Sequence, residues 1–322
     1  MDLTYIYPKN LAEFLCILIL AIIFDFVYPY HRGLLYLIHP THTAYTLAFI
    51  LYKIFPKTKA SGLIIWLIVV LSHISIYGVI LYLTCKIHKI LWLIASIYIV
   101  KVSISLKLLI NYVNSVKLCL QRGEITCARE AVSHIVRRDV SKLDEGYVAS
   151  AALESLFESL VDGFTSPLLL YLLLGPLGAL LQRVTNTLDS ALGYKEPNFK
   201  DVGWFSAKAD TYINFIPARF TAFLIILLCP TIKGSMDRSW KIYLRDKNAT
   251  QSKNAGHPMA SASGCLSVRL EKICSYVLGS EYPLPTYRDI HKGLKLAIHV
   301  ALTFLILVIS IYYFVSDIIL IN

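Results

Sequence analysis

Two long segments without charged residues most strongly limit what this chain can fold into. Residues 63–83 contain only His73 as a group able to carry charge, and residues 296–316 contain only His299. Each segment is long enough to cross the hydrocarbon core of a bilayer, about 30 Å thick, as an α-helix. The 322-residue chain is also 56% hydrophobic, with a mean hydropathy of +0.60. We therefore predict an integral membrane protein rather than a soluble bundle of buried helices.

Two further apolar segments are short or interrupted. Residues 164–181 contain Gly175-Pro176 near their middle, and residues 220–232 are few for a full crossing. We expect both to form broken or re-entrant elements, which proteins tolerate where the backbone faces protein or water.

The fold class predicted from this pattern is all-α and polytopic, with about five spanning helices in addition to the two broken segments. The expected spanning helices are residues 11–28, 33–52, 63–83, 90–110 and 296–316. The whole chain, 1–322, is expected to form one membrane domain. Its regions are N-terminal membrane helices (1–110), a cytoplasmic helical region (111–162), the broken segments flanking a polar run (163–232), a cytoplasmic loop (233–295) and a C-terminal membrane helix (296–322).

The net charge of +10 lies mainly in the connections, because only 16% of the residues are charged. Lys and Arg gather in loops 53–59, 111–150 and 233–295, which share one side if the two broken segments either both cross or both fold back. Basic loops mark the cytoplasmic side of a cell membrane. We prefer folding back, which places the active face in the cytoplasm; two crossings would put the polar run outside. Lipid is an expected partner, whereas nucleic acid is not, since the chain has no basic helix or RNA-stacking motif.

The polar run, residues 186–219, lies between the two broken segments. Ionisable groups at membrane depth are costly and are functional candidates by default. Asp210 and Asn214 share a helix face at i, i+4, and Arg219 lies beyond a break expected at Pro217. The planar guanidinium is then placed to bind phosphate or carboxylate. The alternative is a structural ion pair between Arg219 and an aspartate that closes the broken helix.

An acidic stripe lies on the helix expected at residues 143–161. Glu154, Glu158 and Asp162 stand at i, i+4 and i+8, on one side of the helix. A solvated acidic edge would explain them, although like charges at this spacing repel one another. Because the stripe directly precedes an apolar segment, we predict instead a site for Mg²⁺, which prefers a few carboxylates together with phosphate oxygens.

Three weaker signals complete the pattern. His39-Pro40 interrupts an apolar segment and predicts either a broken helix or a kinked spanning helix with satisfied histidines. The turn Asn254-Ala255-Gly256 has backbone N–H groups able to cradle an anion. The seven cysteines show no metal-ligand spacing and several lie in apolar segments, so we expect reduced packing residues. No signal-peptide pattern precedes the first helix, which we expect to be retained.

A series of motifs follows in a fixed order between about residues 20 and 280. The most specific is Asn186-Thr-Leu-Asp-Ser followed by Gly193-Tyr194. The others are Asp25, His39-Pro40, Arg138-Asp139, Leu143-Asp144-Glu145, Glu154, Glu158, Asp162-Gly163, Pro167, Gly203-Trp204, Ala207, Asp210, Asn214, Pro217-Ala218-Arg219, Arg245-Asp246, Ser252, Asn254-Ala255-Gly256 and Pro258. Together they resemble the CobD/CbiB family of cobalamin biosynthesis, the adenosylcobinamide-phosphate synthases.

The resemblance implies a carbon–nitrogen ligase. Such an enzyme would join the carboxylate of the corrinoid adenosylcobyric acid to aminopropanol or its phosphate, giving adenosylcobinamide or its phosphate. ATP would be the co-substrate and Mg²⁺ the expected cofactor. Because the sequence has no GxxxxGK[ST], the nucleotide site must differ from a P-loop.

The resemblance and the local chemistry together assign roles to particular residues. The expected catalytic residues are Glu154, Glu158, Asp189, Asp210, Asn214 and Arg219. The expected substrate- or nucleotide-binding residues are His39, Asn186, Tyr194, Arg245, Asp246, Asn254 and Gly256. The expected metal ligands are Glu154, Glu158 and Asp162.

The chain departs from the family pattern at a few positions, among them Ser159, Thr211, Thr250 and Met259. These departures leave open a degenerate paralogue or a non-catalytic scaffold, although the retained acidic residues favour an active enzyme. A transporter would also show broken helices and intramembrane polar groups. The absence of an internal repeat, and the concentration of polar groups in the connections, argue against transport.

Overall fold

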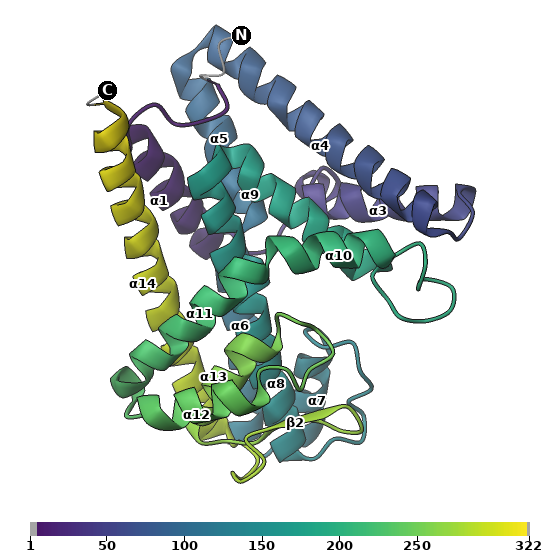
Figure 1. Ribbon diagram of the computed structural model, residues 1–322, viewed down its shortest axis with the longest axis vertical. Coiled ribbons are helices and arrows are strands. Elements are labelled where there is room, and N and C mark those ends of the chain that lie inside the picture. The colour runs from purple at the N-terminus through teal and green to yellow at the C-terminus, as the bar shows by residue number, and fades with distance from the viewer. Residues whose placement is uncertain (1–4, 321–322) are drawn as a thin grey trace. The chain divides into compact units, whose positions relative to one another are not determined.

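The computed structural model describes residues 5–320, with side chains through Val315, and these residues are mostly helical (Figure 1). The helices are α1 (Leu11–Val27), α2 (Leu34–Leu37), α3 (Pro40–Ile54), α4 (Lys59–Ile87), α5 (Lys89–Ser103), α6 (Leu106–Gln121), α7 (Ile125–Ser133), α8 (Glu145–Leu160), the π-helix η1 (Val161–Thr165), α9 (Ser166–Leu192), α10 (Trp204–Ile213), α11 (Phe215–Leu228), the 3₁₀-helix η2 (Cys229–Ile232), α12 (Met236–Asp246), α13 (Gly256–Leu266) and α14 (Tyr287–Leu320). An antiparallel hairpin, β1 (Leu270–Lys272) and β2 (Tyr276–Leu278), pairs Leu270 with Leu278.

The chain forms two compact units, each assembled from separate stretches. Unit 1 comprises Met1–Ser105, Ser166–Ile213 and Leu307–Asn322, and unit 2 comprises Leu106–Thr165 and Asn214–Ile306. In unit 1, α9 packs on α3, α4, α5 and α10, whereas in unit 2, α8 packs on α6, α7, α13 and β1. The five consecutive regions expected from sequence therefore do not coincide with the units, because α8 and α9 follow one another in the chain yet pack on different partners.

Within the described part of the chain, five helical stretches are long and apolar enough to cross a membrane: Lys59–Ile87, Lys89–Gln121, Glu145–Leu192, Phe215–Ile232 and Tyr287–Val315. The prediction of an all-α polytopic membrane protein is confirmed. However, these five stretches are not the same five that the sequence predicted. The expected spans at residues 11–28 and 33–52 form the shorter helices α1 and α3, of 17 and 15 residues.

Glycine and proline break the apolar helices at the predicted places. Gly175, directly before Pro176, has φ 69° and ψ −161° inside α9, a conformation that favours glycine. A side chain at Gly175 would also collide with the backbone of Ile6. At His39-Pro40, α2 ends at Leu37 and α3 begins with the proline, whose missing N–H costs nothing at the first helical position. The broken helix is thus the observed alternative there.

The two segments expected to be interrupted or short belong to longer helical stretches. Residues 164–181 lie within Glu145–Leu192, and residues 220–232 lie within Phe215–Ile232. The length argument for re-entrance of residues 220–232 is therefore wrong, because flanking residues extend this helix. The break predicted at Pro217 is also displaced to Asn214, which separates α10 from α11; Pro217 lies in the first turn of α11, where a proline is tolerated.

Four of the seven cysteines are paired, so the prediction that they are reduced packing residues is wrong for these four. Cys119–Cys127 joins α6 to α7, and Cys229–Cys265 joins η2 to α13. The sequence spacing gave no signal, because helix packing brings the partners together.

Candidate functional site

The predicted site residues divide between the two units. Unit 1 holds His39, Asn186, Asp189, Tyr194 and Asp210. Unit 2 holds Glu154, Glu158, Asp162, Asn214, Arg219, Arg245, Asp246, Asn254 and Gly256. Within each unit, side chains from distant motifs contact one another.

In unit 1, the packing of α9 against α10 joins two members of the polar run. The Nδ2 of Asn186 donates a hydrogen bond to Oδ1 of Asp210 over 3.1 Å. Asp189 lies about one turn after Asn186 on α9, and its carbonyl accepts from the N–H of Gly193 at the end of that helix. Tyr194 donates its hydroxyl to the carbonyl of Ser190 over 3.1 Å. The most specific motif of the sequence therefore closes the end of α9, where the Asp189 carboxylate lies beside Gly193, and presents the Asn186 amide to Asp210 of α10.

A buried lysine in unit 1, Lys101, was not predicted from the sequence as a site residue. Lys101 is only 1% exposed, so its side chain faces the interior of the protein instead of extending to the membrane surface. Its Nζ lies 2.9 Å from Nε2 of His31, and the His31 and His39 rings lie 4.4 Å apart between centroids. Asp25, also buried, interacts electrostatically with Lys101. The available signal was a lysine inside an apolar helix, which marks a functional candidate.

Arg183 adds a second strong cation, near His39. Its Nε and Nη2 donate to the carbonyl of Ser103 over 2.8 and 2.6 Å, which fixes the guanidinium at the end of α5. Its positive charge interacts electrostatically with the imidazole of His39. His39 itself caps α3 through Nδ1, which accepts from the N–H of Thr41 over 3.2 Å. We call Lys101, Arg183, His31 and His39 the basic cluster of unit 1.

In unit 2, the carboxylate of Glu154 is surrounded by donors. Arg138 donates to both of its oxygens over 3.1 and 3.2 Å. Ser150, one turn earlier on α8, donates to Oε1 over 2.6 Å, and the hydroxyl of Tyr276 donates to Oε2 over 2.6 Å. Burial, together with the negative charge and hydrogen bond of Glu154, raises the pKa of Tyr276, so its phenol remains a donor. Tyr276 lies on β2 and carried no sequence signal.

The other two members of the acidic stripe are less enclosed. Glu158 is exposed and Asp162 is half-buried in η1, the π-helical turn between α8 and α9. Single π-helical turns are frequent at functional sites, because they change which side chains share a face. Glu154, Glu158 and Asp162 do not bring three ligand atoms together among the residues described. The Mg²⁺ assignment stays a prediction.

Arg219 contacts a second predicted motif in unit 2. Its Nη1 donates to the carbonyl of Phe215 over 2.7 Å and to Oδ1 of Asn254 over 3.3 Å. The guanidinium also stacks on the Phe215 ring, 3.3 Å from its centroid. Asn254 directly precedes Ala255, the N-cap of α13, so these contacts place Arg219 at the start of that helix. The structural alternative, a salt bridge from Arg219 to an aspartate, is not among the ion pairs of the described residues.

His257 lies in the first turn of α13 and was not predicted as a site residue. Its Nδ1 is 3.1 Å from the hydroxyl of Tyr243. Burial, with the positive charges of Arg219 and Lys247 nearby, lowers the pKa of His257 to about 4. The imidazole is therefore neutral at pH 7 and offers one donor and one acceptor at the start of the helix.

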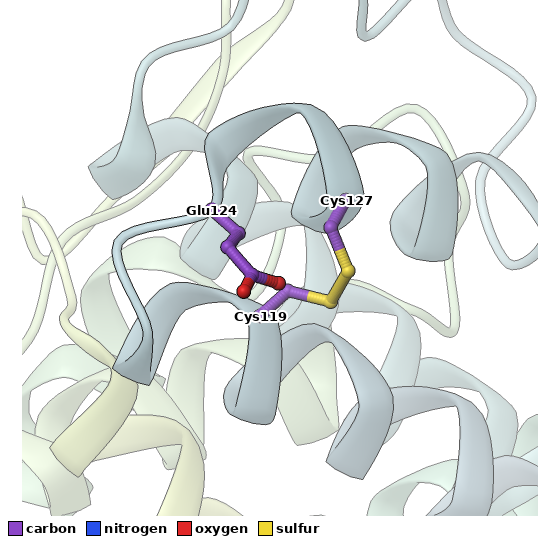
Figure 2. A group of neighbouring side chains, drawn as sticks. All are labelled: Cys119, Glu124 and Cys127. Carbon is purple, nitrogen blue, oxygen red and sulfur yellow. A yellow bond between two sulfur atoms is a disulfide. The ribbon is translucent and has the colours of Figure 1, made fainter.

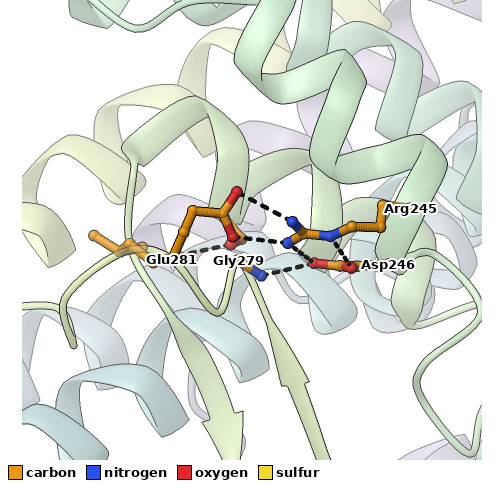
Figure 3. A network of polar contacts seen from close by, with 6 residues as sticks. Arg245, Asp246, Gly279 and Glu281 are labelled. Atoms are coloured by element: carbon orange, nitrogen blue, oxygen red, sulfur yellow. Dashed lines mark hydrogen bonds and ion pairs between the residues drawn. The ribbon is translucent and has the colours of Figure 1, made fainter.

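Arg245 and Asp246 take part in a closed ion-pair network (Figure 3). Arg245 donates to both oxygens of Asp246 over 2.7 and 2.8 Å and to both oxygens of Glu281 over 2.8 and 3.2 Å. The N–H of Gly279, after β2, donates to Asp246 over 2.7 Å. These contacts tie the end of α12 to the turn that follows the hairpin. The nucleotide-binding role of Arg245 and Asp246 stays a prediction. Their observed contacts hold the end of α12 against the turn that follows the hairpin.

Gly256 lies where its backbone passes close to the backbone of Lys247. It begins α13, and a side chain there would collide with the carbonyl of Lys247. Ser252 Oγ accepts from the N–H groups of Asn254 and Ala255 over 3.3 and 3.2 Å, which shapes the turn. The Asn-Ala-Gly motif is thus a tight entry into a helix.

The comparisons with known proteins agree with this set of motifs. A family model described as CobD/Cbib protein matches residues 18–305. The chain belongs to this family. No solved structure matches the chain.

Several curated relatives cover most of the chain. A "Probable cobalamin biosynthesis protein CobD" of Aeropyrum pernix is 42% identical over 304 residues, which is 94% of this chain and 93% of the relative. A protein of the same name from Methanothermobacter thermautotrophicus is 35% identical over 265 residues, 82% of this chain and 86% of the relative. A "Cobalamin biosynthesis protein CobD" of Clostridium perfringens is 35% identical over 247 residues, 76% of this chain and 78% of the relative.

Proposed function

We propose that this CobD/Cbib family member acts in cobalamin biosynthesis as an ATP-dependent carbon–nitrogen ligase. It joins the carboxylate of adenosylcobyric acid to the amine of aminopropanol or its phosphate. The names of the relatives support the pathway, and the ordered motifs support the reaction.

The chemistry sets clear requirements. A carboxylate is a poor electrophile, so the γ-phosphoryl group of ATP is first transferred to it, giving an acyl phosphate and ADP. The amine then attacks the acyl carbon, a proton leaves the nitrogen, and phosphate departs. The protein must hold phosphate oxygens, stabilise charge that develops on the acyl group and accept the proton.

The observation that carries the proposal is the hydrogen bond from Arg219 to Asn254. It joins two motifs 35 residues apart in the chain. The result is a guanidinium beside the start of α13, where backbone N–H groups and the helix dipole favour an anion. A planar cation next to a helix N-terminus suits a phosphate group, with neutral His257 as an additional hydrogen-bonding partner.

Unit 1 supplies a second set of suitable groups. We infer that the basic cluster would hold an anionic part of a reactant, and that Asn186 with Asp210 would offer a donor and an acceptor to polar substrate atoms. The hydroxyls of Thr185 and Ser206 are buried without a hydrogen-bond partner in the part of the chain described. Buried polar groups are nearly always satisfied, so these two are consistent with a polar ligand or water beside the Asn186–Asp210 pair.

Mg²⁺ would neutralise the phosphates of ATP at the acidic stripe. Glu154 already accepts hydrogen bonds from three side chains, so we assign it a positioning role towards Arg138 and Tyr276. Glu158 and Asp162 are then the carboxylates that would bind the ion, in line with the few protein ligands that Mg²⁺ takes.

The direct test uses purified protein in detergent with adenosylcobyric acid, ATP and Mg²⁺. Aminopropanol and aminopropanol phosphate are supplied in separate reactions, and the amide product and ADP are measured by mass spectrometry. The proposal requires product that depends on ATP with at least one of the two amines. A folded protein that makes no product with either amine contradicts it.

The Arg219→Lys variant tests the anion clamp. Loss of the guanidinium fork removes charge-assisted hydrogen bonds worth about 1.5–3 kcal/mol, so KM for ATP or for the corrinoid should rise about 10- to 150-fold with unchanged thermal stability. Arg238→Lys, at an exposed position on α12, is the matched control and should leave both unchanged. A fall in stability without a selective rise in KM would instead assign Arg219 a structural role.

A further inference from the structure

The turn between α6 and α7 folds the chain back on itself. Gly123 has φ +73°, a left-handed conformation that ends α6. The N–H of Glu124 then donates to the carbonyl of Cys119 over 3.0 Å, which returns the chain over the last turn of α6. Glu124 is the N-cap residue of α7, and Cys127 is the third residue of that helix. The backbone thus places residues 119, 124 and 127 together independently of any bond between their side chains.

These three side chains form a compact group of metal-binding atoms (Figure 2). One ligand atom from each of Cys119, Glu124 and Cys127 lies within 4.8 Å of the other two. Among the residues described, no other three His, Cys, Asp or Glu side chains meet this condition. In the structure the two sulfurs form a disulfide, with their Cα atoms 5.6 Å apart.

We propose that Cys119, Glu124 and Cys127 form a binding site for a thiophilic divalent cation such as Zn²⁺ when their disulfide is reduced. Zn–S bonds of about 2.3 Å and Zn–O bonds of about 2.1 Å place tetrahedral ligand atoms about 3.4–3.8 Å apart. Reduction breaks the bond between the two sulfurs and so allows them to separate to this spacing, while the turn keeps the three residues together. Two thiolates with one carboxylate favour zinc over Mg²⁺ or Ca²⁺, and water completes the fourth position.

The disulfide and the metal exclude each other, because both use the same sulfurs. A dithiol or phosphine reductant supplies two electrons, and two protons are taken up, converting the disulfide to two thiols. Binding of the cation releases two protons as the thiols become thiolates. The N-terminal turn of α7 assists this step, since its dipole stabilises negative charge on Cys127.

The site is reachable from solvent on one side. Glu124 is exposed and Cys127 is half-buried, whereas Cys119 is 7% exposed and closes the inner side. The other disulfide provides a contrast. Cys229 and Cys265 are 0% and 2% exposed and belong to no such three-ligand group in the described part of the chain. Only the α6–α7 disulfide therefore combines access with a third ligand.

Co²⁺ is the probe, because bonds to thiolate give it a charge-transfer absorption that the aqua ion lacks. The full chain in detergent is reduced anaerobically with a phosphine and titrated with Co²⁺. We expect one equivalent to bind with thiolate-to-cobalt absorption that Zn²⁺ removes, and no such absorption in the disulfide form. Cys119→Ser and Cys127→Ser should each abolish the tight site. Glu124→Gln should weaken Co²⁺ binding at least about tenfold, since loss of even an outer-sphere partner costs 10- to 100-fold.

Cys274→Ser is the matched control, because Cys274 is an exposed free cysteine in the same unit and should not affect the signal. Circular dichroism shows whether each variant retains its helices. Reduced, helical wild type without thiolate–cobalt absorption overturns the proposal, and so does an unchanged signal in Cys127→Ser. Because the readout is spectroscopic, the result is independent of whether the chain makes the amide bond.

Discussion

Replacing Tyr276 by Phe tests whether the donors around Glu154 hold the fold of unit 2. The substitution keeps the ring and removes only the hydroxyl that donates to Oε2 of Glu154 over 2.6 Å. Glu154 keeps its bonds to Arg138 and Ser150, so the carboxylate is not left uncompensated. The change therefore isolates one hydrogen bond to a charged acceptor.

The expected cost follows from the burial of the two partners. A hydrogen bond to a charged group contributes about 1.5–3 kcal/mol. Glu154 is 5% exposed whereas Tyr276 is only half-buried, so we expect a cost around the lower end of this range, about 1–2 kcal/mol. In a Glu154→Gln background the acceptor is neutral, and the same substitution should cost about 0.5–1 kcal/mol. The coupling energy between the two positions is then about 0.5–1 kcal/mol.

The assay is equilibrium unfolding in mixed detergent micelles, with wild type, both single variants and the double variant forming a cycle. Tyr212→Phe is the control, because Tyr212 is 72% exposed and loss of its hydroxyl should be neutral. Equal costs for Tyr276→Phe in the two backgrounds would show that the hydroxyl acts elsewhere. A variant as stable as wild type would refute the account of Glu154 as an enclosed, fully bonded carboxylate.

Three further outcomes are expected. Glu158→Gln should lower turnover at least tenfold at any Mg²⁺ concentration while the protein stays folded. Near-normal rates would instead favour the interpretation of the acidic stripe as a solvated helix edge without a bound ion. Hydrogen bonds from Arg245 hold the pKa of Glu281 below its usual value, and they hold the pKa of Asp246 low although burial raises it. The stability from this network is thus present above about pH 4–5 and lost as pH falls through the depressed values. Since Arg245 and Glu281 are about half exposed, the loss on acid titration should stay below about 1 kcal/mol and shrink in Glu281→Gln; a larger loss would contradict this exposure. A cysteine placed at Lys247 should resist membrane-impermeant labelling of intact cells, and labelling from outside would overturn the cytoplasmic assignment of loop 233–295.

The sequence alone determined the class of the protein and the places where its helices break. The backbone N–H and C=O groups of residues 63–83 can all form hydrogen bonds in an apolar environment only if the segment is a helix, because no other structure pairs these groups within one segment. Gly175-Pro176 and His39-Pro40 break their helices through restrictions on φ and through a missing donor, which act within a few residues. The order of the motifs was likewise readable without the fold.

Local rules failed where the context of a residue changed its effect. Pro217 was expected to break its helix, but it falls in the first turn of α11, where no intrahelical N–H is required. The length of the segment at residues 220–232 was underestimated for a similar reason. Its polar and aromatic flank continues the helix from Phe215, and hydropathy does not reveal this.

Only the tertiary structure decided which side chains meet. Tyr276 reaches Glu154 across 122 positions, and Lys101 reaches His31 across 70. The disulfides and the division into two units depend equally on which helices pack together. Hydropathy and turn chemistry constrain the backbone over a few residues, whereas these contacts arise from the packing of segments far apart in the chain. That packing gives Glu154 its donors, and it places Arg219 at the start of α13.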